Sequence, residues 1–204
     1  MMYLGIDGGI KGAMVLIDSD AAILGSWKMP LNAVKKVDPI LILKLLGVIE
    51  QFSFDRMEDI RVGVERLLSL PSDTNEVGMA VDGLYRAKTP ADREGFYDRI
   101  KRALKKTDGR VGTMTMGINW GYVVAAIVAK GWRYDTWSPR TWQAEMHRGV
   151  DAPRSTAKQR SALVASRLWP DEDWRFERMR KPHDGKIDAA LIAEYTRRQY
   201  VSSR

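Results

Sequence analysis

The sequence predicts an α/β fold in which a mixed five-stranded sheet is flanked by helices. Short apolar stretches that end at Gly, Pro or charged residues indicate strands, and longer stretches with apolar residues at helical spacing indicate helices. Along the chain they follow the order β-β-β-α-β, a polar insertion, and then α-β-α-α. This order is typical of a mixed sheet with helices packed on it. The 204 residues, 45% of them hydrophobic, are expected to form a single domain over 1–204.

The first half of the chain supplies four of the five predicted strands. Residues 3–7 and 13–17 form a predicted hairpin around the glycines at 8, 9 and 12, and residues 22–29 form a third strand that Pro30 ends. A helix is predicted over 38–54, with Asp38 as N-cap and Pro39 at its first position. Its core face is expected to consist of Ile40, Leu41, Leu45, Val48, Ile49 and Phe52. A buried strand over 61–67 follows and carries Glu65.

Residues 71–113 break the pattern, because they are polar and basic with one amphipathic stretch over 92–106. They are interpreted as an insertion that contains a helix. A core helix over 119–130, ended by Gly131, a strand over 132–137 and a short helix that begins at Ser138 and Pro139 are expected next. Two further helices are predicted over 155–168 and 184–200, the second with Ile187, Leu191 and Tyr195 on one stripe.

Composition limits the chemistry that is possible. The chain has no cysteine and only two histidines, His147 and His183, so a bound metal is expected to sit mainly on oxygen. No long apolar stretch or signal-like N-terminus is present, so no membrane association and an intracellular, cytoplasmic location are expected. The net charge of +7 favours a polyanionic partner such as nucleic acid.

Four carboxylates stand out by position. Asp7 follows an apolar strand at a sharp turn, where a plain turn aspartate is the alternative, and Glu65 ends a strand that otherwise looks buried, where an ion pair with Arg61 or Arg66 is the alternative. Asp184 and Asp188 share one side of a first helical turn, where helix capping by Asp184 with a solvated Asp188 is the alternative. If the four converge, Mg²⁺, with Mn²⁺ as a substitute, suits such an all-oxygen site, and two such ions favour phosphodiester hydrolysis.

Several motifs in order resemble those of the RuvC-type Holliday junction resolvases of the ribonuclease H-like superfamily, especially their bacteriophage and plant organellar branch. The carboxylate strands resemble the family's first and second acid motifs, and Lys186 to Ala193 resembles its final helix. Further similarity lies in Gly117–Tyr122, Trp137–Trp142 and Lys158–Pro170. The insertion at 71–113 departs from the family pattern. So does Gly185, which stands three residues before Asp188, where bacterial members place a ligand, so either Asp184 (preferred) or His183 takes that role.

The resemblance implies a homodimeric, Mg²⁺-dependent endonuclease that nicks four-way DNA junctions symmetrically, with Asp7, Glu65, Asp184 and Asp188 as metal ligands and no nucleotide cofactor. It also implies host cytoplasm as the location if the protein is phage-encoded. His183 is a possible ligand or general base, and Lys186 or Lys158 is a possible source of positive charge at the cleaved phosphate. Phosphate contacts or base stacking are expected from the insertion and its neighbour helix, through Arg99, Lys101, Arg102, Lys105, Lys106 and Tyr122.

Three other functions compete with junction resolution. A broader nuclease for flaps and bulges would use the same carboxylates. An actin-like ATPase or sugar kinase would share the Gly-Ile-Asp-Gly-Gly start but needs two comparable domains, and a silent DNA-binding module would not need all four acids.

Overall fold

The computed structural model of the chain describes residues 1–66, 89, 95, 110–150 and 155–201. The chain divides into two compact units, one formed by Met1–Arg66 with Asn119–Arg204 and the other by Leu67–Ile118. The first unit contains the whole sheet and all four carboxylates. Most of the predicted 71–113 insertion, including its expected helix, lies outside the described residues. The expectation of a single domain over 1–204 stays a prediction.

The sheet confirms the predicted fold class. Its strands are β1 (Met2–Ile6), β2 (Ala13–Ile17), β3 (Ile23–Lys28), β4 (Ile60–Glu65) and β5 (Arg133–Trp137), in the order β3-β2-β1-β4-β5. The first three strands pair antiparallel, as the predicted hairpin requires, whereas β4 is parallel to β1 and β5 is parallel to β4. The sheet is therefore mixed, with β1 at its centre.

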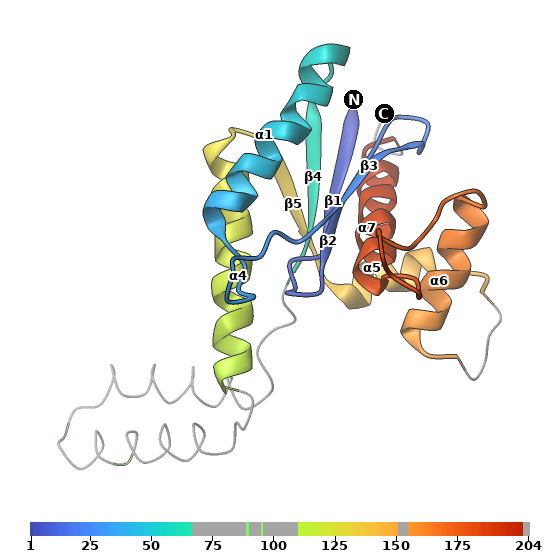
Figure 1. Cartoon of the computed structure of the whole chain (residues 1–204). Helices are drawn as coiled ribbons and strands as arrows, with labels where there is room; N and C mark the ends of the chain where they lie inside the picture. The colour runs from blue at the N-terminus through green and yellow to red at the C-terminus, as the bar shows by residue number, and fades with distance from the viewer. Residues whose placement is uncertain (67–88, 90–94, 96–109, 151–154, 202–204) are drawn as a thin grey trace. The chain divides into compact units, whose positions relative to one another are not determined.

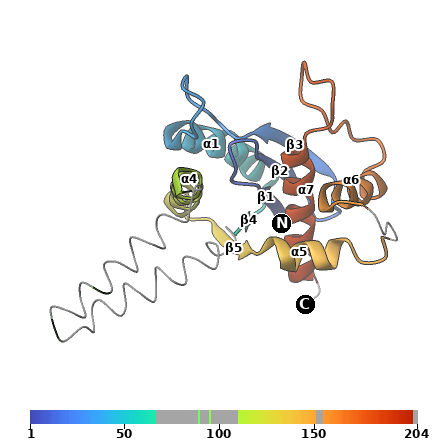
Figure 2. The same cartoon turned by 90° about the horizontal axis from the view of Figure 1, so that it is seen from below.

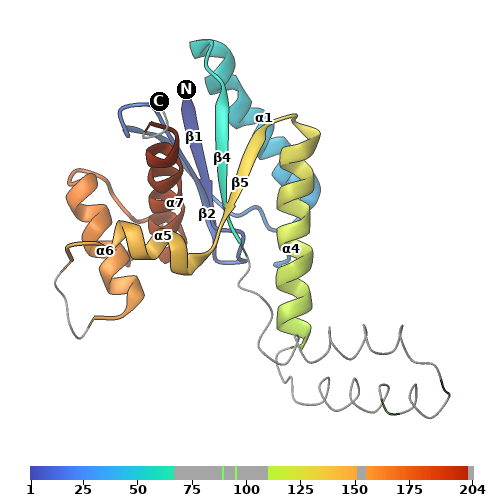
Figure 3. The same cartoon turned by 180° about the vertical axis from the view of Figure 1, so that it is seen from behind.

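Helices cover both faces of this sheet, as Figures 1 and 3 show. On one face, α1 (Pro39–Arg56) and α4 (Arg110–Ala129) pack over the even-numbered side chains of β1, including Leu4 and Ile6. On the other face lie α5 (Pro139–Met146), α6 (Ala157–Leu168) and α7 (Asp184–Val201). Each face has its own apolar core, so β1 and β2 are buried along their whole length.

The predicted helix starts are confirmed where a capping side chain is present. The Asp38 carboxylate accepts hydrogen bonds from the backbone N–H groups of Ile40 and Leu41, and the Ser138 hydroxyl accepts one from Thr141. Thr156 and Gln159 form a capping box at the start of α6. The start predicted for α4 is wrong, because this helix begins at Arg110 and Asn119 is a buried residue inside it.

The core face predicted for α1 is also wrong in part. The fully buried residues are Ile42, Leu46 and Ile49, whereas Ile40 is 63% exposed and Val48 is 55% exposed. The helix carries apolar residues on nearly all sides, so their spacing did not show which side packs on the sheet. Among the described residues, no helix is long and apolar enough to cross a membrane.

The last helix lies directly on the central strands because two glycines leave room for it. A Cβ atom on Gly5 of β1 would lie 2.0 Å from the backbone oxygen of Ala189, and one on Gly63 of β4 would lie 2.0 Å from Thr196 Oγ1. Helix α7 is accordingly buried on nearly all sides from Gly185 to Thr196. This close packing determines what its N-terminal turn can reach.

Candidate metal-binding nuclease site

Asp7 and Glu65 lie side by side at the carboxyl ends of two parallel strands. Ile6 of β1 pairs with Val64 of β4, so the next residue of each strand, Asp7 and Glu65, continues the same register. Neighbouring strands are about 5 Å apart. Gly5 and Gly63 face α7, and Asp7 and Glu65 each lie two positions further along the chain. Because side chains alternate between the two faces of a sheet, both carboxylates point towards α7.

The N-terminal turn of α7 brings Asp184 and Asp188 to the same end of the sheet. This turn packs against the β1–β2 hairpin: a Cβ atom on Gly185 would lie 2.4 Å from the backbone oxygen of Lys11 and 3.0 Å from Asp7 Oδ2. Figure 2 views the first unit from this end, with α7 and α5 beside β1 and β4. The four predicted residues thus gather where the strands end and α7 begins.

Burial and mutual repulsion disfavour the charged form of three of these carboxylates. Burial, followed by the charges of Asp7 and Asp188, raises the pKa of Glu65 to about 7. Burial, opposed by a hydrogen bond from Ser161 and reinforced by the charges of Asp7 and Asp184, raises the pKa of Asp188 to about 6. Burial also raises the pKa of Asp7, although Oδ1 accepts a hydrogen bond from the Gly9 N–H at 3.1 Å. That turn interaction is the alternative considered for Asp7, and here it coexists with the proximity of the other acids.

Lys158 of α6 supplies positive charge to this group. Its Nζ lies 2.6 Å from Asp184 Oδ2, and both side chains are more than half exposed. Within the described part of the chain, no three Asp, Glu or His side chains are arranged to hold one metal ion as they stand. The donor set nevertheless fits a hard divalent cation, because every candidate offers carboxylate oxygens and a cation would offset the repulsion among Asp7, Glu65 and Asp188.

His183 lies at the position just before α7. Its backbone oxygen accepts hydrogen bonds from the N–H groups of Lys186 and Ile187, and its Nδ1 accepts a further one from Lys186 N at 3.1 Å. The ring packs edge to face on Phe176, with centroids 5.0 Å apart. His183 therefore caps the helix that carries Asp184, which is the role that had been considered for Asp184 itself. Nε2 of His183 has no hydrogen-bond partner among the described residues.

Lys186 lacks the free positive charge that contact with a cleaved phosphate requires. The side chain is buried, and its Nζ lies 2.6 Å from Glu172 Oε1 and 2.6 Å from the backbone oxygen of Asp173. Its ammonium group also lies 5.4 Å from the centre of the Phe176 ring. A cation held this way anchors the segment before α7 and is not free to contact a DNA phosphate, because burial and three partners have replaced the solvent that surrounds a surface lysine.

Most residues expected to contact DNA lie outside the described residues, namely Arg99, Lys101, Arg102, Lys105 and Lys106. Tyr122 is described and is 38% exposed on α4. The ion pair considered for Glu65 is not formed with Arg61, whose Nε lies 3.0 Å from Asp135 Oδ2.

Three residues that were not among the predicted site residues lie next to the carboxylates on the side of α5 and α6. Trp142 Nε1 donates a hydrogen bond to Glu65 Oε1 at 3.3 Å, the Ser161 hydroxyl lowers the pKa of Asp188, and His147 lies against both Trp142 and Ser161. Only Trp142 had a signal in the sequence, as the end of the motif Trp137–Trp142.

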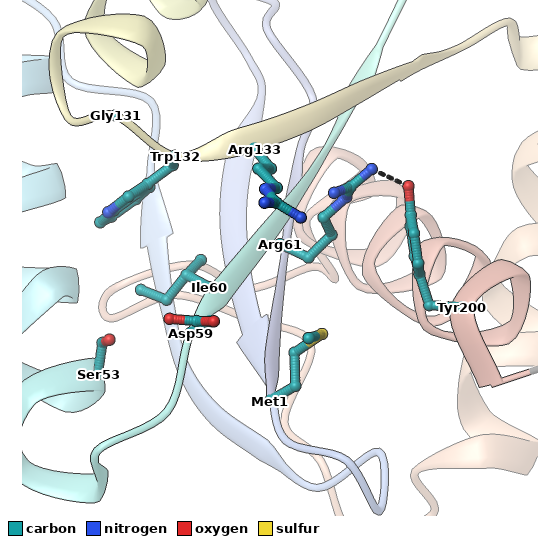
Figure 4. Close-up of a pocket in the computed structure, with 9 residues that line it drawn as sticks. All are labelled: Met1, Ser53, Asp59, Ile60, Arg61, Gly131, Trp132, Arg133 and Tyr200. Atoms are coloured by element: carbon teal, nitrogen blue, oxygen red, sulfur yellow. Dashed lines mark hydrogen bonds between the residues drawn. The ribbon is translucent and has the colours of Figure 1, made fainter. Parts of the chain in front are cut away.

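A cavity of about 460 Å³ lies at the opposite end of the sheet (Figure 4). It is lined by Ile60, Arg61 and Arg133 at the starts of β4 and β5, and by Tyr200 near the end of α7. Arg61 is hydrogen-bonded there to Tyr200 and to Asp135. None of the four carboxylates lines this cavity, so the cavity is separate from the candidate site at the carboxyl ends of the strands.

Comparison with known proteins gives a result at the level of structure alone. No protein-family model matches the sequence, and no curated protein matches it. A solved structure of RuvC from Thermus thermophilus is similar, with a TM-score of 0.53 and 15% identity, over 98% of this chain and 97% of that one. The T. thermophilus RuvC structure in complex with a Holliday junction substrate has a TM-score of 0.50 and 15% identity, over 100% of this chain and 96% of that one. The chain therefore has the ribonuclease H-like fold of RuvC, as the motifs in its sequence predicted.

Proposed function

We propose that this protein is a metal-dependent endonuclease that resolves four-way DNA junctions by symmetric hydrolysis of two phosphodiester bonds. One observation carries the proposal: the register of β1 and β4 and the packing of α7 bring Asp7, Glu65, Asp184 and Asp188 to one end of the sheet. The fold shared with RuvC, of which one solved structure contains a Holliday junction, supports the choice of substrate.

In this proposal, Asp7, Glu65, Asp188 and Asp184 hold Mg²⁺, for which Mn²⁺ substitutes. Bound divalent cations activate the attacking water and stabilise the leaving oxygen in this class of reaction. Asp7 and Glu65 are positioned by the sheet, and Asp188 and Asp184 by the first turn of α7. Lys158, which is exposed and beside Asp184, is free to move to a DNA phosphate when a metal takes its place. His183 has Nε2 available as a further ligand or as a base.

Symmetric cutting needs two sites, so the proposal includes a homodimer. The outward face of α4 carries Gly121, Tyr122, Ala125, Val128 and Ala129, all exposed and none charged. A second copy packed on this face meets no like charge, although the chain has a net charge of +7. The small residues also allow two helices to approach closely. Replacement of Val128 by Glu is expected to convert a dimer into a monomer in analytical ultracentrifugation; an unchanged mass would reject this contact.

The deciding experiment compares cleavage of a synthetic four-way junction with cleavage of a flap, a bulge and a linear duplex in Mg²⁺. The proposal expects paired, symmetric nicks in the junction and much slower cutting of the linear duplex. Equal rates on all four substrates would point to a general nuclease, and preference for the flap or bulge would favour the broader branch-specific enzyme. Hydrolysis of ATP without DNA cutting would favour the kinase-like alternative.

Substitution links the cutting to the site. The Asp7→Asn protein is expected to bind the junction and to lose most of its cutting rate, because a ligand charge is removed without a change in shape. Asp20→Asn is the matched control, since Asp20 is exposed in the β2–β3 turn, at the other end of the sheet. Retained cutting by Asp7→Asn would reject the assignment.

A further inference from the structure

Two buried donors from the helices behind the site reach two of its carboxylates. Trp142 of α5 is fully buried, and its Nε1 donates to Glu65 Oε1 at 3.3 Å. Ser161 of α6 is 2% exposed, and its hydroxyl lies close enough to the Asp188 carboxylate to lower the pKa of that group. Neither donor faces solvent, so both have been placed by the packing of α5 and α6 beside α7.

His147, the residue that ends α5, connects the two donors. Its Nε2 lies 3.2 Å from Ser161 Oγ, and its ring packs edge to face on Trp142, with centroids 6.2 Å apart and planes at 75°. A serine hydroxyl has a single hydrogen. A carboxylate only accepts, so a Ser161 hydroxyl that turns its hydrogen towards Asp188 has its oxygen available to accept from His147 in the imidazole tautomer with hydrogen on Nε2. In this arrangement the chain of donation runs from His147 to Ser161 to Asp188.

This arrangement addresses a specific physical problem. Asp7, Glu65 and Asp188 repel one another, and a carboxylate with no fixed donor turns away from its neighbours or takes up a proton. A donor at one oxygen of the carboxylate fixes the direction in which the other oxygen points. Partners of this kind behind a metal ligand typically change metal affinity by about 10- to 100-fold.

We propose that Trp142 and Ser161, aligned through His147, are positioning residues that hold Glu65 and Asp188 in the orientation needed to bind divalent metal. This inference rests on the proposed metal-dependent function. The competing explanation is that the three residues only fill the space between α5, α6 and α7. A residue that only fills space can be replaced by another of similar shape and volume. A positioning residue must keep the group that donates the hydrogen bond, so substitutions distinguish the two roles.

The test is Mn²⁺ binding to the full chain, measured by isothermal titration calorimetry, together with the Mg²⁺ concentration that gives half-maximal junction cutting. Ser161→Ala removes one oxygen and is expected to weaken Mn²⁺ binding about tenfold. Ser161→Thr retains a hydroxyl and is expected to bind within about twofold of the wild type. Ser166→Ala, an exposed serine on the same helix, is the matched control and is expected to be unchanged.

Equal Mn²⁺ affinity in Ser161→Ala and the wild type would overturn the inference, as would equal weakening in the alanine and threonine variants. If Ser161→Ala does not fold by circular dichroism, His147→Phe serves instead, because it retains a ring against Trp142 but removes the nitrogen that donates to Ser161. It is expected to weaken Mn²⁺ binding several-fold, and unchanged binding would overturn the inference. Failure of the proposed function is distinguishable, because the wild type itself would then neither bind Mn²⁺ nor cut.

Discussion

Replacement of Glu65 by Gln is expected to stabilise the metal-free protein. In the folded state, burial and the neighbouring charges of Asp7 and Asp188 raise the pKa of Glu65 from 4.5 to about 7. At about 1.4 kcal/mol for each pKa unit, an ionised Glu65 costs the folded state up to about 3 kcal/mol. Asp7 and Asp188 share part of this repulsion, and it is removed from them too when Glu65 loses its charge. A gain of about 1 to 3 kcal/mol in the free energy of unfolding is therefore expected at pH 8. Gln retains an oxygen to accept from Trp142.

The sign of the pH dependence makes this prediction specific. A carboxyl whose pKa is raised by folding binds more protons in the folded state, so its penalty develops as pH rises from about 4.5 through about 7. The gain in free energy of unfolding from Glu65→Gln should therefore be complete at pH 8 and fall below about 1 kcal/mol at pH 5. Urea unfolding in EDTA at both pH values measures it, with the exposed Glu177→Gln as control. The reasoning is refuted if Glu65→Gln is no more stable than the wild type at pH 8, or if its advantage persists at pH 5.

Three further outcomes are expected. Mg²⁺ should raise the unfolding midpoint of the wild type more at pH 8 than at pH 5, because binding requires the ionised forms of Glu65 and Asp188; equal shifts would contradict this. Lys186→Met should cost about 2 to 3 kcal/mol in urea unfolding, because it leaves Glu172 without its partner, whereas an unchanged midpoint would show that the anchor is unimportant. Gly185→Ala should abolish cutting, since its Cβ would meet the backbone oxygen of Lys11, and normal activity would disprove this close contact.

The elements that could be predicted from the sequence are those with a local cause. The hairpin of β1 and β2 followed from its glycine turn, and the starts of α1 and α5 followed from a capping side chain and a proline at the first helical position. These signals act within a few residues, so no knowledge of the rest of the chain was needed.

The predictions that proved wrong concern features that depend on the packing of another part of the chain. Ile40 and Val48 were expected in the core and are exposed, because the orientation of an apolar helix depends on the sheet beneath it. Helix α4 begins at Arg110, well before its predicted start at Asn119. Lys186 was considered for contact with DNA, and only the folded chain reveals Glu172 beside it.

The same division applies to the candidate site. The sequence alone determined which residues are unusual there, because an acid at the end of an apolar strand or on an apolar helix is costly without a partner. Tertiary structure decided that Asp7 and Glu65 are neighbours, through the parallel register of β1 and β4, and that α7 lies close enough to add Asp188, through Gly5 and Gly63. The tertiary structure also placed Trp142 beside Glu65 and Ser161 beside Asp188. Hydrogen bonds between side chains far apart in the sequence depend on packing in three dimensions, and no local pattern encodes them.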